Sequence, residues 1–332
     1  MIHPIPPGTR DVLPEEMAEL RRLQSSLLGV FERFGFQEVR TPTIEYAEVL
    51  ERGGGSGVED AYRFFDDRGE LLALRTDMTI PIARLVATRF GELEPPYRLS
   101  YLANAYRAVT PKRAELREFG QAGIELIGAA GADGTAEVVE VLGRTLDAVG
   151  LREARVGLGE ADLWSCLLTD FGGDQALLAE TTGLLARHDI VGIEAALAAS
   201  ELDRDRCKSL LGMIQLRGGP QVIDQARGLG GSRFGECLDR LESTYHAIAA
   251  RGGAERVRID LGLMRELGYY SGTTIEVYDP SVGEIIGGGG RYDGLMRRFG
   301  ADHAAAGFTL YLEPIHKAQI EQGLSGAGPP DA

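Results

Sequence analysis

Cysteine and histidine are scarce in this sequence of 332 residues. The three cysteines, Cys166, Cys207 and Cys237, lie far apart along the chain, and none belongs to a CxxC pair. This spacing favours neither a zinc site nor a disulfide framework, and a reducing cytoplasm is the simplest location for such a chain. Because no two of the five histidines stand at metal-ligand spacing, the sequence predicts no metal site.

Long apolar runs and an excess of positive charge are also absent. No stretch approaches the roughly 20 apolar residues that cross a bilayer, and the start, MIHPIPPGTRDVLPEE, is not typical of a secretory signal. The 50 acidic residues outnumber the 35 basic ones, which gives a net charge of -15. Since nucleic-acid binders draw much of their affinity from cationic contacts to phosphates, we expect no nucleic-acid partner and no membrane association.

Signatures of nucleotide binding and of hydrolytic catalysis are missing too. The glycine run GGGGRYDG, residues 287–294, has neither the GxGxxG of a dinucleotide fold nor the Lys and Ser/Thr of a P-loop, and no GxSxG occurs. We interpret these glycines as positions where a strand passes close to another backbone or to a ligand. Segment 128–141 is faintly similar to the ribose- and pyrophosphate-binding loop of phosphoribosyltransferases, but we favour a polar turn in which Asp133 or Thr135 caps a helix.

The apolar pattern that remains predicts an α+β protein. Hydrophobic residues make up 44% and charged residues 26% of the chain, as in a globular protein with a substantial core. A helix is expected between Pro14 and Gly35, and two strands, at 96–109 and 116–128, flank a polar loop as in a hairpin. Further strand patterns follow one another after residue 255, which indicates an antiparallel sheet with helices on one side.

Ala- and Leu-rich helical segments interrupt the strand patterns. We therefore expect a discontinuous domain made of residues 1–160 and 251–322, with a helical insertion at 161–250. The last residues, 323–332, have the composition of a disordered tail.

Several polar residues stand on segments that are otherwise apolar and strand-like. On a strand, residues two or four apart face the same way, so Asp77 and Thr79 are expected to share a face, as are Gln121 and Glu125. Buried charges need partners or a polar ligand, and a small zwitterion supplies both signs. The residues concerned are Asp77, Thr79, Arg107, Gln121, Glu125, Arg265, Tyr269 and Tyr270.

Six segments in sequence order together resemble the catalytic domain of histidyl-tRNA synthetase. They are GTRDVLPEE, GFQEVRTPTIE, LALRTDMT, AYRAVTPKRAELREFGQAGIELIG, RELGYYSGTTIEVY and GGGGRYDGL. The resemblance implies the class II aminoacyl-tRNA synthetase fold, an antiparallel sheet flanked by helices. It also implies that GFQEVRTPTIE is a dimer-interface motif, which ends near Pro42.

The same resemblance implies a histidine pocket. The ammonium group of histidine would meet Asp77, Thr79 and Gln121, and the imidazole would lie between Glu125 and Tyr270. Asp77 is a departure, because the family has the longer Glu there. The remaining pocket positions are Arg107 and Arg265, which would face the carboxylate, and Tyr269 and Tyr292.

The nucleotide half of the synthetase site does not match. Val109 replaces an acidic residue that meets adenine, and Glu115 replaces an arginine that contacts phosphate. Pro314 stands where the family has an arginine that stacks on ATP, and proline offers neither charge nor a stacking group. The chain also ends near the point where the synthetase would begin its anticodon-binding domain, so we expect none.

A synthetase-like chain of this kind resembles the regulatory subunit family of ATP phosphoribosyltransferase. The resemblance implies a partner, a short-form catalytic subunit that joins ATP to phosphoribosyl pyrophosphate in the first step of histidine biosynthesis and is inhibited by histidine. It implies no catalytic residue and no cofactor in this chain, and a dimer within a hetero-oligomer. The alternatives are a free-standing histidine-activating enzyme and a scaffold whose pocket is a relic.

Overall fold

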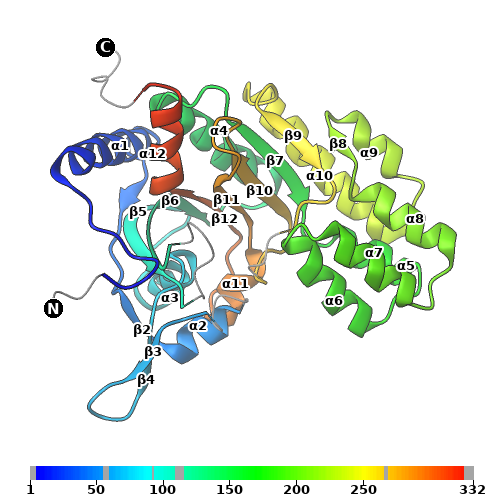
Figure 1. Cartoon of the computed structure of the whole chain (residues 1–332), viewed down its shortest axis with the longest axis horizontal. Coiled ribbons are helices and arrows are strands. Elements are labelled where there is room, and N and C mark those ends of the chain that lie inside the picture. The colour runs from blue at the N-terminus through cyan, green and yellow to red at the C-terminus, as the bar shows by residue number, and fades with distance from the viewer. Residues whose placement is uncertain (1–4, 55–59, 92, 109–115, 265–267, 325–332) are drawn as a thin grey trace.

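The structure is a computed structural model that describes residues 5–54, 60–91, 93–108, 116–264 and 268–324 (Figure 1). Within these ranges the chain forms a sheet of nine strands and a smaller sheet of three. In order across the large sheet, the strands are β1 (Gln37–Glu38), β5 (Tyr97–Tyr106), β6 (Glu118–Ile127), β12 (Ala305–Tyr311), β11 (Ile285–Arg291), β10 (Thr273–Tyr278), β7 (Arg155–Glu160), β9 (Val257–Asp260) and β8 (Arg217–Gly218).

The large sheet is antiparallel from β5 through β7, and β8 pairs with β9 in the same way. Two pairs run parallel, β1 with β5 and β7 with β9, so the sheet is mixed rather than wholly antiparallel. Parallel neighbours need a long crossover connection, and helices supply it in both cases. The predicted hairpin is confirmed, because β5 and β6 pair from Tyr97 opposite Ile127 to Tyr106 opposite Glu118.

One face of the sheet packs against a layer of helices, α1 (Pro14–Arg33), α4 (Gly131–Ala148), α10 (Ser232–Ala250) and α12 (Leu312–Glu321). Helix α1 begins with Pro14 and has Glu15 and Glu16 in its first turn, where a fixed φ and negative charge favour a helix start. Its apolar stripe, which includes Leu27 and Phe31, is buried in this core.

Helix α4 begins earlier than the sequence predicted, at Gly131, and the capping prediction for its first turn is wrong. Asp133 and Thr135 already lie inside the helix, and no side chain caps it within the described residues. The hydroxyl of Thr135 instead accepts a hydrogen bond from Arg291 Nε at 3.0 Å. Arg291 also donates to the carbonyl of Gly131 at 2.8 Å, so this guanidinium ties β11 to the start of α4.

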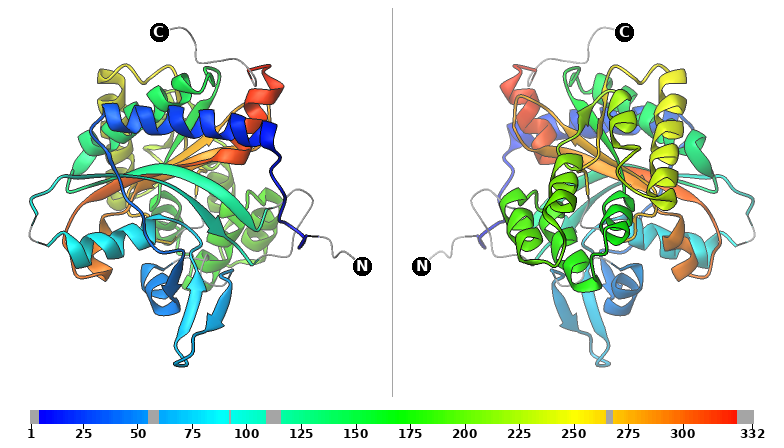
Figure 2. Two further views of the ribbon diagram at one scale, coloured as in Figure 1. Left: turned by 90° about the vertical axis from the view of Figure 1, so that its left-hand side faces the viewer. Right: turned by 90° about the vertical axis from the view of Figure 1, so that its right-hand side faces the viewer.

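The opposite face packs against α2 (Ala47–Gly53), α3 (Thr79–Arg89) and α11 (Asp293–Arg298), which share a second apolar core. Figure 2 shows α1 on one side of the sheet and these shorter helices on the other. The small sheet projects from this second layer and consists, in order, of β2 (Ile44–Tyr46), β4 (Leu71–Leu74) and β3 (Arg63–Phe65).

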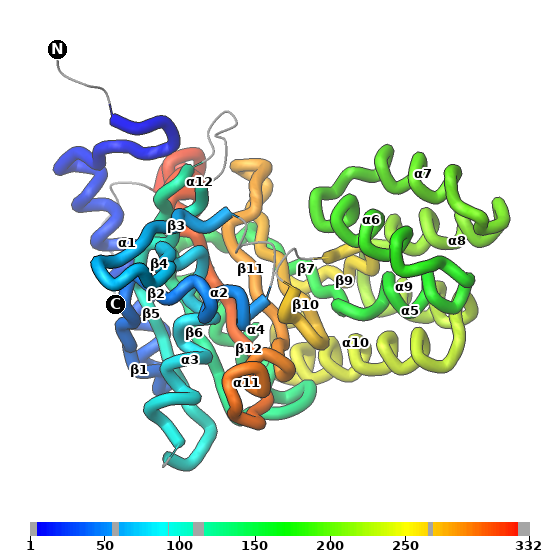
Figure 3. Tube along the Cα trace, turned by 90° about the horizontal axis from the view of Figure 1, so that it is seen from below, coloured from blue at the N-terminus to red at the C-terminus, as the bar shows by residue number. Residues whose placement is uncertain are grey.

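Between β7 and β9 the chain forms a group of helices beside the sheet, α5 (Leu163–Asp170), α6 (Gln175–Ala186), α7 (Ile190–Ala199), α8 (Arg204–Met213), α9 (Gln221–Ala226) and α10 (Figure 3). Asp174, Asp189 and Asp203 cap α6, α7 and α8 by accepting backbone N–H bonds. The division into domains at residues 160 and 251 stays a prediction, since α10 also packs on α4.

The glycine run belongs to strand β11, between β10 and β12. A Cβ atom on Gly287 would lie 2.6 Å from the carbonyl oxygen of Thr309, and one on Gly290 would lie 2.5 Å from that of Thr273. Side chains at these positions would therefore collide with neighbouring strands. The prediction that the glycines allow close backbone approach is confirmed.

Across the ranges that the structure describes, none of the helices has both the length and the apolar character needed to cross a bilayer.

Candidate functional site

Glu125, on β6, is the centre of a buried polar cluster on the sheet face that packs against α2, α3 and α11. Its Oε1 accepts a hydrogen bond from the Thr79 hydroxyl at 2.7 Å, and its Oε2 accepts one from the Tyr292 hydroxyl. Thr79 is the first residue of α3, and Tyr292 follows β11 directly. Three separate segments therefore converge on one carboxyl group.

The alternation of β6 explains why Glu125 faces this side. Ala122 and Ile124 point into the core under α1 and α4, so Gln121, Gly123 and Glu125 point the opposite way, as the sequence predicted. Gly307 lies directly opposite Glu125 on β12. A Cβ atom at Gly307 would collide with Glu125 Oε2, so only glycine leaves room for the carboxyl group.

Asp77 and Thr79 lie at the start of a helix, not on a strand. The carboxylate of Asp77 accepts the backbone N–H of Ile80 at 3.0 Å, as a residue near a helix N-terminus commonly does. The strand geometry expected for this pair was wrong, but the turn carries both buried side chains toward Glu125. That the two residues belong to a histidine pocket stays a prediction.

Tyr269 and Tyr270 stand in the turn before β10 and contribute two aromatic rings. Their ring centroids lie 4.9 Å apart, and Tyr269 lies 5.9 Å from Tyr292 in an edge-on arrangement. The ring of Tyr270 occupies the space beside Gly290, where a Cβ atom would lie 2.9 Å from it. The glycine run therefore also gives clearance to a tyrosine of the candidate site.

Gln121 is a residue of the cluster whose side chain can accept a further hydrogen bond. Its side chain is buried, and its Oε1 has no hydrogen-bond partner among the described residues. Leaving a buried acceptor without a donor costs free energy, so this oxygen is suited to an external donor such as an ammonium group.

The two arginines expected to face a ligand carboxylate are not both part of the described cluster. Arg107 lies after β5 with its guanidinium carbon 5.1 Å from the ring centre of Phe119, and its charge acts on Asp77. Arg265 lies outside the described residues.

The electrostatics of the cluster favour neutral acids. Burial is the main cause that raises the pKa of Glu125 to about 8; the hydroxyls of Tyr292 and Thr79 oppose the rise, and the neighbouring Asp77 adds to it. Burial likewise raises the pKa of Asp77, with Ile80 N–H and Arg107 opposing it. Since a cation near a carboxyl group favours its ionised form, the cluster can take up a cationic ligand with loss of a proton.

Sequence reasoning missed Tyr101 and Thr309, which extend the cluster. The Tyr101 side chain is buried, and its hydroxyl lies 2.6 Å from that of Thr309 on β12. Tyr101 pairs with Gly123 in the register of β5 and β6, so it faces the same side as Glu125. The alternation of Tyr97, Leu99 and Tyr101 along the predicted strand was the available signal.

The nucleotide side of the synthetase-like site is described only in part. Val109 and Glu115 lie outside the described residues. Pro314 lies in the first turn of α12, after Glu313, whose two carboxylate oxygens each lie 3.1 Å from the N–H of Gly120. Burial raises the pKa of Glu313. Pro314 is therefore a proline at a helix start; that it replaces a nucleotide-binding arginine stays a prediction.

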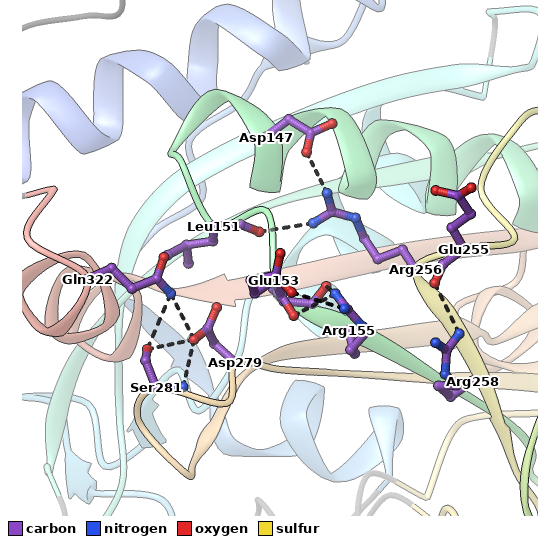
Figure 4. A network of polar contacts seen from close by, with 11 residues as sticks. Asp147, Leu151, Glu153, Arg155, Glu255, Arg256, Arg258, Asp279, Ser281 and Gln322 are labelled. Carbon is purple, nitrogen blue, oxygen red and sulfur yellow. Dashed lines mark hydrogen bonds and ion pairs between the residues drawn. The ribbon is translucent and has the colours of Figure 1, made fainter.

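Two cavities lie elsewhere, and neither is lined by a candidate residue of the described part. One, of about 420 Å³, borders α4 and is lined by part of the polar network of Figure 4, where Arg256 donates to the carbonyl of Leu151 at 3.0 Å and pairs with Asp147. The other, of about 480 Å³, lies over β7, β9 and β10, and its Arg217 pairs with Asp260 at 2.9 Å. We assign neither cavity a role, since these guanidinium groups are engaged within the protein.

Among the residues placed by the structure, no group of three or more His, Cys, Asp or Glu side chains is arranged to hold a metal ion.

Comparison with known proteins agrees with this fold and site. The family model described as histidyl-tRNA synthetase matches residues 8–315. A Moorella thermoacetica protein named ATP phosphoribosyltransferase regulatory subunit is 39% identical over 319 residues, which are 96% of this chain and 82% of that protein. A protein of the same name from Symbiobacterium thermophilum is 40% identical over 328 residues, 98% of this chain and 82% of its own length.

A solved structure gives the same result. The crystal structure of an ATP phosphoribosyltransferase regulatory subunit/histidyl-tRNA synthetase from Bacillus halodurans superposes with a TM-score of 0.87 at 31% identity, over 96% of this chain and 83% of that one. The chain therefore belongs to the histidyl-tRNA synthetase family and, within it, to the ATP phosphoribosyltransferase regulatory subunits.

Proposed function

We propose that this chain is a non-catalytic regulatory subunit of ATP phosphoribosyltransferase that binds histidine in the Glu125 cluster. The observation that carries the histidine assignment is the buried carboxyl group of Glu125, held between the hydroxyls of Thr79 and Tyr292. Kinship with proteins of that name supports the regulatory role in histidine biosynthesis.

The chemistry of histidine matches the cluster. Its ammonium group offers donors to Asp77 and to the unpartnered Oε1 of Gln121. Its imidazole N–H can donate to Glu125, while Tyr270 lies on the other side of the ring. Because the cluster is buried in the structure, we propose that the turn carrying Tyr269 and Tyr270 moves to admit the ligand.

The resemblance to the synthetase implies that the ATP site is lost, which supports the non-catalytic part of the proposal. Pro314 cannot stack on adenine or offer a charge, and Val109 and Glu115 replace the other two nucleotide contacts that the family uses. A free-standing histidine-activating enzyme would catalyse histidine-dependent exchange between ATP and pyrophosphate. We expect no such exchange above background in an assay of the purified chain.

The partners in this proposal are a short-form catalytic subunit and a second copy of the chain. An exposed apolar face on the small sheet supports the second copy. Ile44, Tyr46 and Phe64 are 46%, 51% and 37% exposed there, and the register of the strands places them on one side with Leu72. Ile44 also belongs to the segment that resembles the dimer-interface motif.

Calorimetric titration with histidine tests the pocket. We expect wild type to bind and Glu125→Gln to bind at least about tenfold more weakly, because a hydrogen bond to a charged group contributes about 1.5–3 kcal/mol. Glu118→Gln is the matched control, since Glu118 is an exposed carboxylate on the same strand. No binding by wild type at millimolar histidine, or equal binding by both variants, contradicts the assignment.

A further inference from the structure

Two of the three cysteines, 71 positions apart in the sequence, lie side by side in the structure. Cys166, on α5, and Cys237, on α10, have their sulfur atoms 3.7 Å apart. The third, Cys207 on α8, has its thiol directed to the carbonyl of Leu197 at 3.6 Å. The pair joins the first and last helices of the group that follows β7, a closeness that the sequence spacing gave no reason to expect.

The two thiols differ in their access to solvent. Cys237 is buried, whereas Cys166 is half-buried. Burial raises the pKa of Cys237 to about 12, although the neighbouring Arg240 opposes the rise. Cys166 is therefore the sulfur that a small oxidant in solution meets first, and Cys237 lies directly behind it as the second thiol.

A charged group built around the pair distinguishes it from a simple apolar contact. Arg240, three residues after Cys237, donates to its sulfur at 3.2 Å and to Glu160 Oε1 at 2.7 Å and 2.9 Å. Glu160 ends β7, and its other oxygen, Oε2, is buried without a hydrogen-bond partner among the described residues. The charge of Arg240 favours the thiolate of Cys237 against the effect of burial, and the thiolate is the form in which this second thiol attacks another sulfur atom.

We propose that Cys166 and Cys237 form a reversible disulfide when the protein meets a peroxide. The sulfur of Cys166 attacks one peroxide oxygen, the O–O bond breaks, and one water leaves as Cys166 becomes a sulfenic acid. The sulfur of Cys237 then attacks that of Cys166, the S–S bond forms, the S–O bond breaks, and a second water leaves.

The reaction of the two thiols with one hydrogen peroxide molecule is balanced in atoms and electrons. The two thiols lose two electrons and two protons in total, and one hydrogen peroxide molecule is reduced to two water molecules. The sulfur atoms need to approach from 3.7 Å to the ~2.05 Å of a disulfide, a change of less than about 2 Å. A small dithiol restores both thiols by exchange.

The disulfide would fasten α5 to α10, and the chain is tied to the large sheet both just before α5 and along α10. Ala161, between β7 and α5, donates its N–H to the carbonyl of Gly272 at 3.0 Å. Thr244, on α10, lies within 3.2 Å of Thr273 through their hydroxyls. Gly272 and Thr273 follow the turn of Tyr269 and Tyr270, so the modification would stiffen the support of that turn.

Thiol mapping of the full chain tests the proposal. The protein is treated with hydrogen peroxide under native conditions, free thiols are blocked with N-ethylmaleimide, and the product is digested and analysed by mass spectrometry. We expect a peptide pair linked through Cys166 and Cys237, two hydrogen atoms lighter than the sum of the reduced peptides, which dithiothreitol abolishes. Cys207 remains blocked as a free thiol.

Cysteine variants distinguish a specific disulfide between Cys166 and Cys237 from nonspecific oxidation. Cys207→Ser is the matched control and should form the link as wild type does, whereas Cys166→Ser should form none. Since Cys237→Ser alters a buried position and can disturb folding, a melting curve provides the second measurement. Oxidation should raise the melting temperature of wild type and Cys207→Ser but not that of Cys166→Ser.

Several results would overturn the proposal. These are oxidation of Cys166 to sulfinic or sulfonic acid without a linked peptide, a link through Cys207, and a link that forms only in urea. An unchanged melting temperature of the linked wild type would show that the bond does not fasten the two helices, and would overturn the structural part of the inference.

Discussion

At the scale of single residues, the chain places an acidic group where water cannot reach it. Glu125 is buried and keeps its place through two hydroxyl donors, Thr79 and Tyr292, and one glycine, Gly307. Isolated buried charge is costly, so the group stays protonated until a partner compensates for ionisation. A site of this kind responds to a ligand that brings its own positive charge and donors.

The raised pKa of Glu125 predicts the pH dependence of stability. The folded state holds this proton up to a pKa of about 8, whereas the unfolded chain loses it near 4.5. Stability conferred by this group is therefore complete below the unfolded pKa and declines as pH rises toward 8, with a slope of at most ~1.4 kcal/mol per pH unit.

Glu125→Gln should remove that slope. Denaturant unfolding of wild type and variant between pH 5 and pH 9 measures the difference in unfolding free energy. We expect the unfolding free energy of the variant to increase relative to that of wild type as pH rises to about 8, and to increase no further above that pH. A difference that stays constant over the whole range would show that Glu125 titrates as an ordinary exposed carboxylate. Glu118→Gln gives the exposed reference.

A side chain larger than that of glycine at position 307 should clash with Glu125 at the same site. Gly307→Ala brings a methyl group against Glu125 Oε2 and the carbonyl of Ile124, so we expect a loss of about 1–3 kcal/mol or more of unfolding free energy. Gly143→Ala is the matched control, because nothing lies within 4 Å of that helical position in α4. It should gain about 0.5–1 kcal/mol. Equal effects of the two substitutions in thermal unfolding would argue against the packing described for Glu125.

At the scale of secondary-structure elements, the sequence predicted the features that depend on the local spacing of apolar and polar residues. The hairpin of β5 and β6, the helix that starts at Pro14 and the shared face of Gln121 and Glu125 all follow from alternation and helical spacing. The position of Asp77 was misjudged, because a polar residue before a helix and one on a strand give the same short pattern.

The rest of the site depends on contacts between distant segments. Thr79 and Glu125 are 46 positions apart and Tyr292 is 167 beyond Glu125, so no local pattern joins them. Family resemblance supplied those residues before the structure brought them together. It did not supply Tyr101 or Arg291, whose roles depend on the register of β5 and the start of α4.

If the apolar face of the small sheet forms the proposed dimer interface, a charge placed on that face should weaken the dimer. Phe64→Glu places a charge on the apolar face shared with Tyr46, so we expect the dimer dissociation constant to rise at least about tenfold. Phe65→Glu is the matched control, because Phe65 is 71% exposed but lies on the other face of the same strand. Sedimentation equilibrium measures both, and equal weakening, or none, would contradict the proposed interface.

At the scale of the whole molecule, the large sheet separates two hydrophobic cores, only one of which contains the candidate ligand site. The core under α1, α4 and α12 consists mainly of apolar side chains and extends into the helices after β7. The core on the other face includes Tyr101, Tyr269 and Tyr292, which surround the Glu125 cluster. One face therefore stabilises the fold, and the other forms the candidate ligand site next to the projecting small sheet.

We propose that histidine acts through Glu125 on a partner enzyme. The direct measurement is the rate of product formation from ATP and phosphoribosyl pyrophosphate by a short-form catalytic subunit, with this chain added and histidine varied. Wild type and Glu125→Gln should stimulate the reaction equally, but inhibition of the Glu125→Gln complex should need at least about tenfold more histidine. Absence of stimulation would contradict the regulatory role, and identical inhibition curves for the two chains would contradict the role of Glu125.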